Sequence, residues 1–567
     1  MAALVGGSLV GLPSATAGPT AGTGAAVDTL VVSPQGSNDA AGTAQAPMRT
    51  IGKAVAAAHA GQTILVRGGS YHESVTIPVG KTLHLRAYPG EQVQLEGSRV
   101  VSGFSDSGND WVAGNWTPEF DASPTHTRGA KDSTTSGWGF VNPKYPLAAH
   151  PDQVWVDGTA QRQVGSRSAL KPGTFYVDYP QDRLYLGSNP AGKTVRSSDL
   201  VRGLAIRASN SSVEGIDVRR FAPSVPDMGA VTVERPGVSL SNMQISDNAT
   251  TGLHVGATDA DLTGLDLERN GMLGANTVYA DRLQVRDMTA RGNNTEHFNS
   301  SPVSGGLKIT RTRGVHVQDS VFDHNEGPGL WLDESVYDAG ISGNDITDNA
   351  GHGISLEISA KITVADNVLV GNGGHGIKVN NTSSVRIWNN TISGPGRALN
   401  IVQDTRRASN PSTPGHDKRR TTPDPTMTWI NRDINVGNNI LSSTGTSGNC
   451  LLCVEDYSST YSAEQMLVST NGNLYHRTSA SAPRWSVVWS NGTSGPSVYT
   501  ALGAFSAREA QGQSSEEITG GHVLTADHRA SAVVTARQSR MAQPMPAEPA
   551  KLAGVPTGTK RLGALHP

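Results

Sequence analysis

A repeat of 22 to 24 residues constrains this chain more than any other feature. Its clearest copies align without a gap: GPGLWLDES (327–335), GHGISLEIS (351–359) and GHGIKVNNT (374–382). The second glycine of each copy marks one position of the repeat. This position is occupied by Gly306, Gly329, Gly353 and Gly376, and by alanine in the next copy, at Ala398. A fixed period of this size is typical of a solenoid, in which each coil buries its apolar side against its neighbours.

Within each repeat the apolar residues alternate with other residues, as in Leu330-Trp331-Leu332-Asp333. This is the periodicity of short strands, and the runs are too brief for amphipathic helices. Two polar columns keep the same step: Ser320, Asn344, Asn367, Asn390 and Asn325, Asn349, Asn372. Stacked side-chain amides can hydrogen-bond along a coil axis, and Asn tolerates left-handed corners. The sequence therefore predicts an all-β protein, a right-handed parallel β-helix of about 23 residues per coil.

Composition fits a narrow tube filled by aliphatic side chains. Hydrophobic residues make up 36% of the chain and aromatic residues only 5%, with 65 glycines for turns. The net charge of −3 provides no field that would attract nucleic acid. Because no stretch reaches the roughly 18 apolar residues of a membrane span, we expect neither nucleic acid nor membrane as a partner. The oligomeric state is left open.

The repeat and its interruptions divide the chain into six segments. We expect a helical cap over Thr50–Ala60, because a cap covers the open edge of the first coil. Residues 103–196 break the rhythm and contain hairpin-like runs, which indicates a β-rich, sandwich-like insertion. The predicted segments are signal-like 1–27, cap and first coils 28–102, inserted module 103–196, main β-helix 197–445, irregular or β region 446–510, and partly disordered tail 511–567.

The first residues are apolar and small, with Ala15-Thr16-Ala17 as an A-x-A cleavage site, but lack a positive start. We expect either that the true start of a secretory signal lies upstream or that this segment is a remnant of one, and in both cases a secreted protein; a disordered Gly/Ala tail is the alternative. The two cysteines form the run Cys450-Leu451-Leu452-Cys453. In an exported protein this spacing favours a local disulfide over reduced thiols, and redox catalysis lacks its usual context.

The acids of the repeat fall on its outer face. If Leu330 and Leu332 point into the tube, then Asp333 points outward, and Glu357 takes the same place one coil later. Neighbouring strands lie about 4.7–4.9 Å apart, so the two carboxylates should approach to roughly 5–6 Å. That is near the roughly 5–5.5 Å of retaining glycosidases. The outer columns contain Lys308, Trp331, Ser355, Lys378 and Asn400 beside Thr310, Asp333, Glu357 and Asn380.

Outward acids are also what any solvated strand carries. Like charges opposite one another on adjacent strands are destabilising, however, and solubility alone would not select Trp331 beside them. We therefore favour a catalytic pair, Asp333 and Glu357, with Trp331, Lys308, Lys378 and Asn380 binding substrate.

The motifs LWLDES and SLEIS, one coil apart on a β-helix interrupted by a β-rich module, resemble the β-helical β-xylosidases of glycoside hydrolase family 120. The resemblance covers residues 28 to about 440, and its specific part is about 30 residues long. It implies an Asp nucleophile, Asp333, and a Glu acid/base one coil later, Glu357, with an oligo- or polysaccharide as substrate.

The step from Val285 to Val317 is 32 residues, which indicates an inserted loop before the Lys308 coil. Loops on rigid scaffolds often carry binding groups, so Glu296, His297 and Asn299 could reach over the acids; a plain polar loop is the alternative. His352 and His375 precede repeat glycines and could flank the pocket.

A polysaccharide lyase is the rival hypothesis, in which Lys308, Lys378 or the basic loop 405–427 removes a proton from a uronate. We expect no metal or cofactor, because the pair offers few further carboxylates for calcium, which prefers about 6–8 oxygens. A non-catalytic glycan-binding solenoid is the third possibility.

Overall fold

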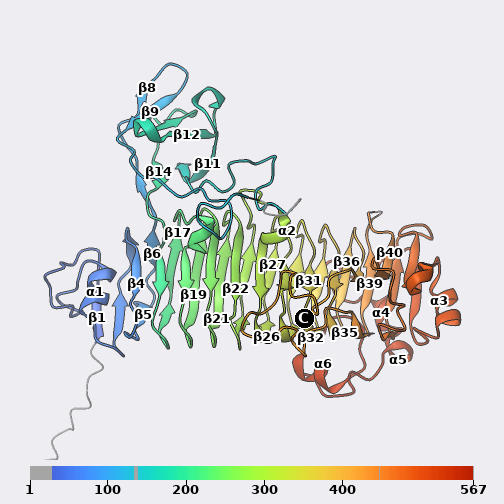
Figure 1. Ribbon diagram of the computed structural model, residues 1–567. Coiled ribbons are helices and arrows are strands. Elements are labelled where there is room, and N and C mark those ends of the chain that lie inside the picture. Colours follow the sequence, from blue (N-terminus) through green and yellow to red (C-terminus); the bar gives the residue numbers. More distant parts are fainter. Residues whose placement is uncertain (1–28, 133–137, 446, 566–567) are drawn as a thin grey trace, which may run out of the picture.

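The computed structural model describes residues 29–132, 138–445 and 447–565. These residues form a right-handed parallel β-helix with three faces, and a β-rich module stands on its N-terminal half (Figure 1). The segment expected to be a signal, 1–27, lies outside the described residues.

Every full coil contributes one strand to each face. The first face consists of β1 (Thr29–Val32), β2 (Thr63–Val66), β5 (His84–Ala87), β16 (Ser212–Glu214), β19 (Ser239–Ser246), β21 (Asp261–Glu268), β23 (Gln284–Arg286), β26 (Arg313–Gln318), β29 (Tyr337–Ser342), β32 (Ala360–Ala365), β35 (Ser383–Trp388), β38 (Arg432–Gly437) and β41 (Val468–Asn471). Strands β19 and β21 continue around the corner into the second face.

The second face consists of β3 (Gly69–Tyr71), β6 (Val93–Glu96), β17 (Ile216–Arg219), β24 (Thr289–Arg291), β27 (Val321–Asp323), β30 (Asp345–Thr347), β33 (Val368–Val370), β36 (Thr391–Gly394), β39 (Ile440–Ser443), β42 (Leu474–Arg477) and β45 (Glu516–Thr519). The third face consists of β4 (Val75–Ile77), β15 (Leu204–Ile206), β18 (Val231–Val233), β20 (Thr251–Val255), β22 (Leu273–Val278), β25 (Gly305–Thr310), β28 (Leu330–Asp333), β31 (Ile354–Glu357), β34 (Ile377–Asn380), β37 (Leu399–Gln403), β40 (Cys450–Asp456), β43 (Trp485–Ser490) and the antiparallel β44 (Pro496–Tyr499).

The register on the third face follows the sequence repeat. Leu307 pairs with Leu330, Leu330 with Ile354, Ile354 with Ile377, and Ile377 with Leu399. All five side chains are at most 1% exposed and belong to one continuous aliphatic core. The predicted alternation is therefore confirmed, with apolar residues in the tube and polar residues on the outer face.

The asparagine columns form two hydrogen-bonded ladders at the corners. Along one ladder the Nδ2 of each residue donates to the Oδ1 of the next at 2.8–3.0 Å, through Asn248, Asn270, Asn293, Asn325, Asn349 and Asn372. The glycine column packs against this ladder. A Cβ on Gly353 would lie 2.7 Å from the carbonyl oxygen of Gly376 and 3.0 Å from Asn372 Nδ2, so the repeat requires glycine there.

Both ends of the solenoid are covered. The predicted N-terminal cap is helix α1 (Ile51–Ala57), with Thr50 as its N-cap and Ile51, Ala54 and Val55 buried against the first coil. At the other end β44 pairs antiparallel with β43, and helix α3 (Leu502–Glu509) packs beside them. A closed edge cannot pair with another chain, so the caps restrict edge-to-edge association.

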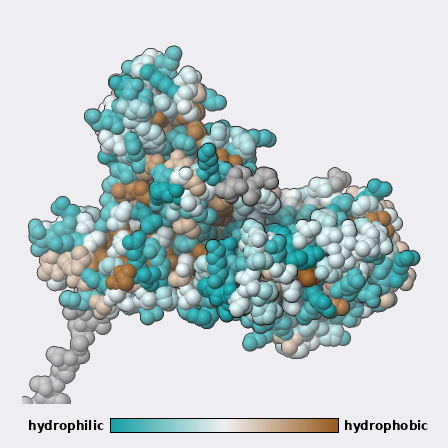
Figure 2. Space-filling model, viewed as in Figure 1, coloured by the Kyte–Doolittle hydropathy of each residue, from teal (hydrophilic) through white to brown (hydrophobic). Residues whose placement is uncertain are grey.

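The inserted module is β-rich as expected. Its eight strands form one mixed sheet, in the order β7 (Ser98–Val100), β14 (Val195–Ser198), β10 (Val154–Val156), β11 (Thr159–Gln163), β12 (Thr174–Asp178), β13 (Arg183–Leu186), β9 (Trp111–Gly114) and β8 (Ser105–Asp106). The module has its own small core around Trp116, Phe175 and Leu184. Apolar residues also gather where it meets the coils (Figure 2).

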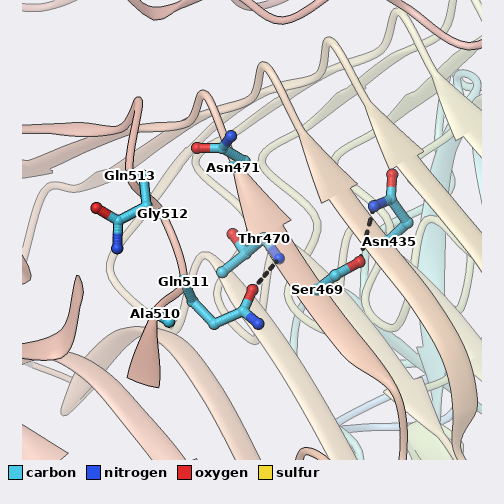
Figure 3. Close-up of a pocket in the computed structure, with 8 residues that line it drawn as sticks. All are labelled: Asn435, Ser469, Thr470, Asn471, Ala510, Gln511, Gly512 and Gln513. Carbon is cyan, nitrogen blue, oxygen red and sulfur yellow. Dashed lines mark hydrogen bonds between the residues drawn. The ribbon is translucent and has the colours of Figure 1, made fainter. Parts of the chain in front are cut away.

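The C-terminal region differs from the expectation. The β-helix does not end near residue 445, because β40, β41, β42, β43 and β45 continue its coils. A small pocket of about 170 Å³ lies between the last coil and the α3–β45 connection, where Thr470 N donates to Gln511 Oε1 at 3.0 Å (Figure 3).

Residues 511–565, expected to be partly disordered, instead fold back along the coils. They contain α4 (Ala532–Thr535), α5 (Gln538–Met541) and α6 (Ala547–Leu552), and α6 lies against β29 and β32 (Figure 1). Apolar side chains explain this order, since Met545, Ala550 and Leu552 pack with Ala365 and Trp388. Because the tail is rich in polar residues, its composition alone does not predict these few apolar contacts.

The sulfur atoms of Cys450 and Cys453 are bonded within β40, with a Cα–Cα separation of 5.8 Å. In the described part of the chain, no helix combines the length and apolar character needed to cross a bilayer.

Candidate active site

Asp333 and Glu357 end two adjacent strands, β28 and β31, on the outer side of the third face. Trp331 pairs with Ser355 and Leu332 with Leu356, which brings the two acids into line at the following position. Although they point away from the tube, they are only 7% and 8% exposed. Something other than the solenoid therefore covers this part of its surface.

One cover is the loop 404–431, which connects β37 to β38. Ser335 Oγ donates to Gly415 O at 2.9 Å, and Arg311 Nε donates to His416 O at 3.1 Å. Ile358 packs with Met427 and Trp429. This loop forms one wall beside the acids.

The other cover comes from the loop 292–304 and the inserted module. Helix α2 (Ser300–Val303) lies in that loop, and Lys308 Nζ donates to its Pro302 O at 2.6 Å. Asn299 Nδ2 donates to Gly139 O of the module at 2.7 Å. The module is thus tied to the edge of the third face just before the Asp333 coil.

Asp333 is held by one cation and one backbone donor. Lys308 Nζ lies 2.9 Å from Asp333 Oδ2, and the N–H of Glu334 donates to Oδ1 at 2.8 Å. The same ammonium lies 3.5 Å from the centre of the Trp331 ring, a cation–π contact. Three residues from two adjacent coils thereby fix the position of this carboxylate.

Glu357 is held from the opposite wall. Arg406 Nη2 lies 2.7 Å from Glu357 Oε1, 2.7 Å from Asp404 Oδ2 and 3.1 Å from Asn380 Oδ1. Burial would raise the pKa of Asp404, but hydrogen bonds from the side chain and backbone N–H of Arg406 outweigh it and bring the pKa to about 2. Each acid of the pair thus has its own cation, which offsets their mutual repulsion.

His352 and His375 stack on each other at the turns before β31 and β34, with ring centroids 4.8 Å apart. Burial, together with the neighbouring His375 and Lys378, lowers the pKa of His352 to about 3. Burial, Arg397 and Lys378 lower the pKa of His375 to about 4. Both imidazoles are therefore neutral near pH 7, beside the outer column that contains Lys378.

The structure places Glu296, His297 and Asn299 differently from the expectation that they reach over the acids. Asn299 anchors the module, and His297 packs against Tyr145 with ring centroids 4.3 Å apart. Glu296 and His297 line a separate cleft under the module. The burial of Phe298 and Val303 with residues of the module explains this, because it turns the loop toward the insertion.

The sequence did not indicate Asp404 or His126 of the module as site residues, and it placed Arg406 only within the basic loop 405–427. Burial, followed by the nearby His254 and Lys308, lowers the pKa of His126 to about 4. For Arg406 the basic run in the loop was a signal, but nothing in the sequence joins His126 to Lys308.

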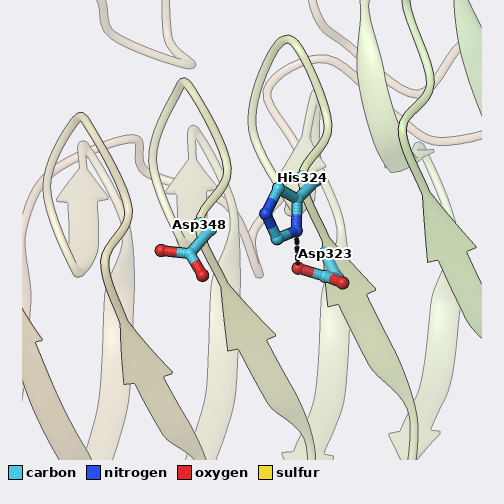
Figure 4. A group of neighbouring side chains, drawn as sticks. All are labelled: Asp323, His324 and Asp348. Carbon is cyan, nitrogen blue, oxygen red and sulfur yellow. Dashed lines mark hydrogen bonds and ion pairs between the residues drawn. The ribbon is translucent and has the colours of Figure 1, made fainter.

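A group of potential metal ligands lies on the second face, remote from the acids in the fold. Side-chain atoms of Asp323, His324 and Asp348 lie within 4.8 Å of one another (Figure 4). Arg291 Nε is 2.8 Å from Asp323 Oδ2 and already balances that charge. We therefore assign no metal to this cluster.

The class defined by this fold is the right-handed parallel β-helix, and comparisons with known proteins agree. Residues 229–392 match the family described as right handed beta helix region, and residues 34–135 match a family of unknown function, DUF1565. Neither match reaches half of the chain.

Two curated proteins share short stretches with this one. Pectate lyase PEL9 of Emericella nidulans is 44% identical over 77 residues, which are 12% of this chain and 19% of that protein. The uncharacterized protein YwoF of Bacillus subtilis is 38% identical over 79 residues, 13% and 17% of the two chains. The chain thus spans less than a fifth of the length of these relatives.

A solved structure of XylC in complex with xylose is similar over a much larger part. It superposes with a TM-score of 0.57 at 16% identity and covers 79% of this chain and 84% of XylC. At this identity the likeness establishes the shared fold.

Proposed function

We propose that this protein is a glycoside hydrolase that acts with retention of configuration. The observation that carries the proposal is the pair Asp333 and Glu357, aligned on adjacent strands in a covered site. Two carboxylates one strand spacing apart suit a double displacement, in which one acts as nucleophile and the other as acid and then base.

In this mechanism Asp333 attacks the anomeric carbon and forms a covalent glycosyl ester, while Glu357 gives its proton to the leaving oxygen. Glu357 then removes a proton from water, which attacks the same carbon and releases Asp333. Lys308 and the Glu334 N–H hold Asp333 in place for the attack.

Arg406 contacts both Glu357 and Asp404. A carboxyl group that donates a proton must first be free of its cation, and Arg406 already has a second partner in Asp404. Rotation of the guanidinium fully onto Asp404 would release Glu357 for the acid step.

Two further observations support a saccharide as substrate. Trp331 Nε1 is buried without a hydrogen-bond partner among the described residues, and the Trp331 ring contacts the same Lys308 ammonium that binds Asp333. A sugar hydroxyl bound there could accept a hydrogen bond from Nε1. XylC, which shares the fold, was solved with xylose bound. A pentoside is therefore the first substrate to test.

The polysaccharide lyase remains the second candidate, favoured by the cations Lys308 and Arg406 in direct contact with the acids. A stretch shared with pectate lyase PEL9 points the same way. The test is product analysis with chromogenic glycosides and polygalacturonate. A hydrolase gives a first-formed anomer of retained configuration by proton NMR, whereas a lyase gives an unsaturated sugar that absorbs in the ultraviolet.

We also propose that the protein is exported. The Cys450–Cys453 disulfide supports this, because disulfides persist mainly in oxidising compartments. Amino-terminal sequencing of protein recovered from culture medium tests it; retention of all of the protein inside cells would contradict the proposal.

A further inference from the structure

A second cleft lies between the inserted module and the corners of the coils below it. Its volume is about 630 Å³, within the roughly 300–1,000 Å³ of small-molecule sites. One wall comes from β10, β11 and β12 of the module, and the other from the turns at Asp247, Arg269 and Thr295–His297. No described contact of these residues reaches Asp333 or Glu357, so the cleft is distinct from the candidate active site.

Glu296 lines this cleft. Its backbone N–H donates to Gly271 O at 3.1 Å, but no described residue donates a hydrogen bond to its carboxyl group. Burial raises the pKa of that carboxyl to about 7, with Arg162 opposing. Glu296 is partly exposed and lines the cleft, so its carboxyl group is available to hydrogen-bond a ligand.

The charged residues that line the cleft are three acids, Asp152, Asp247 and Glu296, and three bases, Arg162, Lys171 and Arg269. Arg269 binds Asp247 with two hydrogen bonds, of 2.8 and 3.1 Å. Asp152 accepts from Tyr179 and, at 3.2 Å, from Gln163 Nε2. Arg162 lies over the Tyr145 ring, which His297 covers as well. The cleft therefore offers hydrogen bonds without a strong net field, which suits a neutral ligand rich in hydroxyl groups.

We propose that this cleft binds a neutral oligosaccharide, with Glu296 and Arg162 hydrogen-bonding its hydroxyls and Gln161 and Thr295 completing the lining. The class of ligand rests on the proposed glycan-active function. The existence of the site rests on the cleft itself. Since His126 of the module lies near Lys308 and other residues of the module line this cleft, the module would hold a second part of a glycan near the active site.

The test uses the full chain with both Asp333→Asn and Glu357→Gln, so that no turnover disturbs binding. Xylo-, cello- and galacturono-oligosaccharides are titrated by calorimetry, and the imidazole signal of His297 is followed by NMR. We expect the xylo- or cello-series to shift the His297 signal. Glu296→Gln and Arg162→Gln should each weaken that binding about tenfold, the cost of about one hydrogen bond.

The matched control is Glu326→Gln, an exposed glutamate on the equivalent corner one coil later, which should leave the titration unchanged. Unaltered binding in the Glu296 and Arg162 variants, or no shift of His297 with any sugar, overturns the site. Binding of galacturono-oligosaccharides alone overturns the ligand class. Failure of hydrolysis is measured separately, as absent turnover by the unaltered chain, and does not alter this readout.

Discussion

Arg406 reaches from the loop 404–431 to within 2.7 Å of Glu357. Asp404, Asn380 and this guanidinium together hold the loop against the third face. The ion pair therefore closes the site and positions the loop that forms its wall. Its loss should loosen this loop and leave the solenoid folded.

Arg406→Ala should loosen the loop. Without the guanidinium, Glu357 is left buried and without its cation. We expect this to reduce the free energy that holds the loop closed by about 1–3 kcal/mol. Tryptic cleavage between Lys418 and Arg420 should accelerate about tenfold or more, because cleavage follows the population of the open state. Arg508→Ala, at a side chain that is 77% exposed, is the control. Equal cleavage rates in both variants would show that Arg406 does not hold the loop.

Glu357→Gln should lower kcat on an active glycoside by about 10²–10⁴-fold, the usual contribution of a general acid. Asp333→Asn should abolish the covalent step and lower kcat further. The control is Glu334→Gln, which changes the neighbouring acid, paired with Arg311 at 2.8 Å, and should leave kcat within about threefold. Steady-state kinetics on a chromogenic glycoside provide the measurement. Activity retained in both variants would refute the proposed pair.

Asn349→Ala should break the corner ladder. This side chain is 1% exposed, donates to Asn372 Oδ1 at 2.9 Å and accepts from Asn325 Nδ2 at 2.8 Å. Its removal leaves buried groups unpaired, and we expect a loss of about 2–4 kcal/mol in the free energy of unfolding. Thermal and urea unfolding measure it. Asn189→Ala, on an exposed turn of the module, should cost no more than about 0.5 kcal/mol.

Stability should depend on pH through Glu296. Burial raises the pKa of this carboxyl to about 7 from 4.5, so the folded chain binds the proton more tightly than the unfolded chain. The stabilisation is complete below pH 4.5 and is lost as pH rises toward about 7. In the unaltered chain the free energy of unfolding should fall by about 1–3 kcal/mol between about pH 5 and about pH 8 because of Glu296. Glu296→Gln should remove this fall.

The comparison of this variant with the unaltered chain isolates Glu296 from other groups. Burial raises the pKa of Asp152, which acts in the same direction, while the lowered pKa values of His352 and His375 act in the opposite one. If both chains lose the same stability over this range, Glu296 does not carry the dependence.

The solenoid could be predicted from the sequence because its register is local and repeated. The alternation around Leu330 and Leu332 and the asparagine columns each specify strand direction and corner position without long-range information. The alignment of Asp333 with Glu357 follows from the same register.

The walls of the site could not be predicted, because they depend on contacts between distant segments. Arg406 meets Glu357 only after the loop has folded back, and Asn299 binds the module through Gly139, far earlier in the chain. The repeat also gave no reason to expect that outward acids would be covered. For the tail, a few apolar contacts such as Leu552 beside the first face outweigh a polar composition.

The inserted module enters and leaves the coil at one place, since β7 pairs with β14. Across the insertion β4 pairs with β15, β5 with β16 and β6 with β17, so the coils meet as if no residues intervened. The module is thus an insertion at a single site that leaves the strand pairing of the β-helix uninterrupted. Exchange of this module for another domain would leave the threading of the tube and its two acids unchanged.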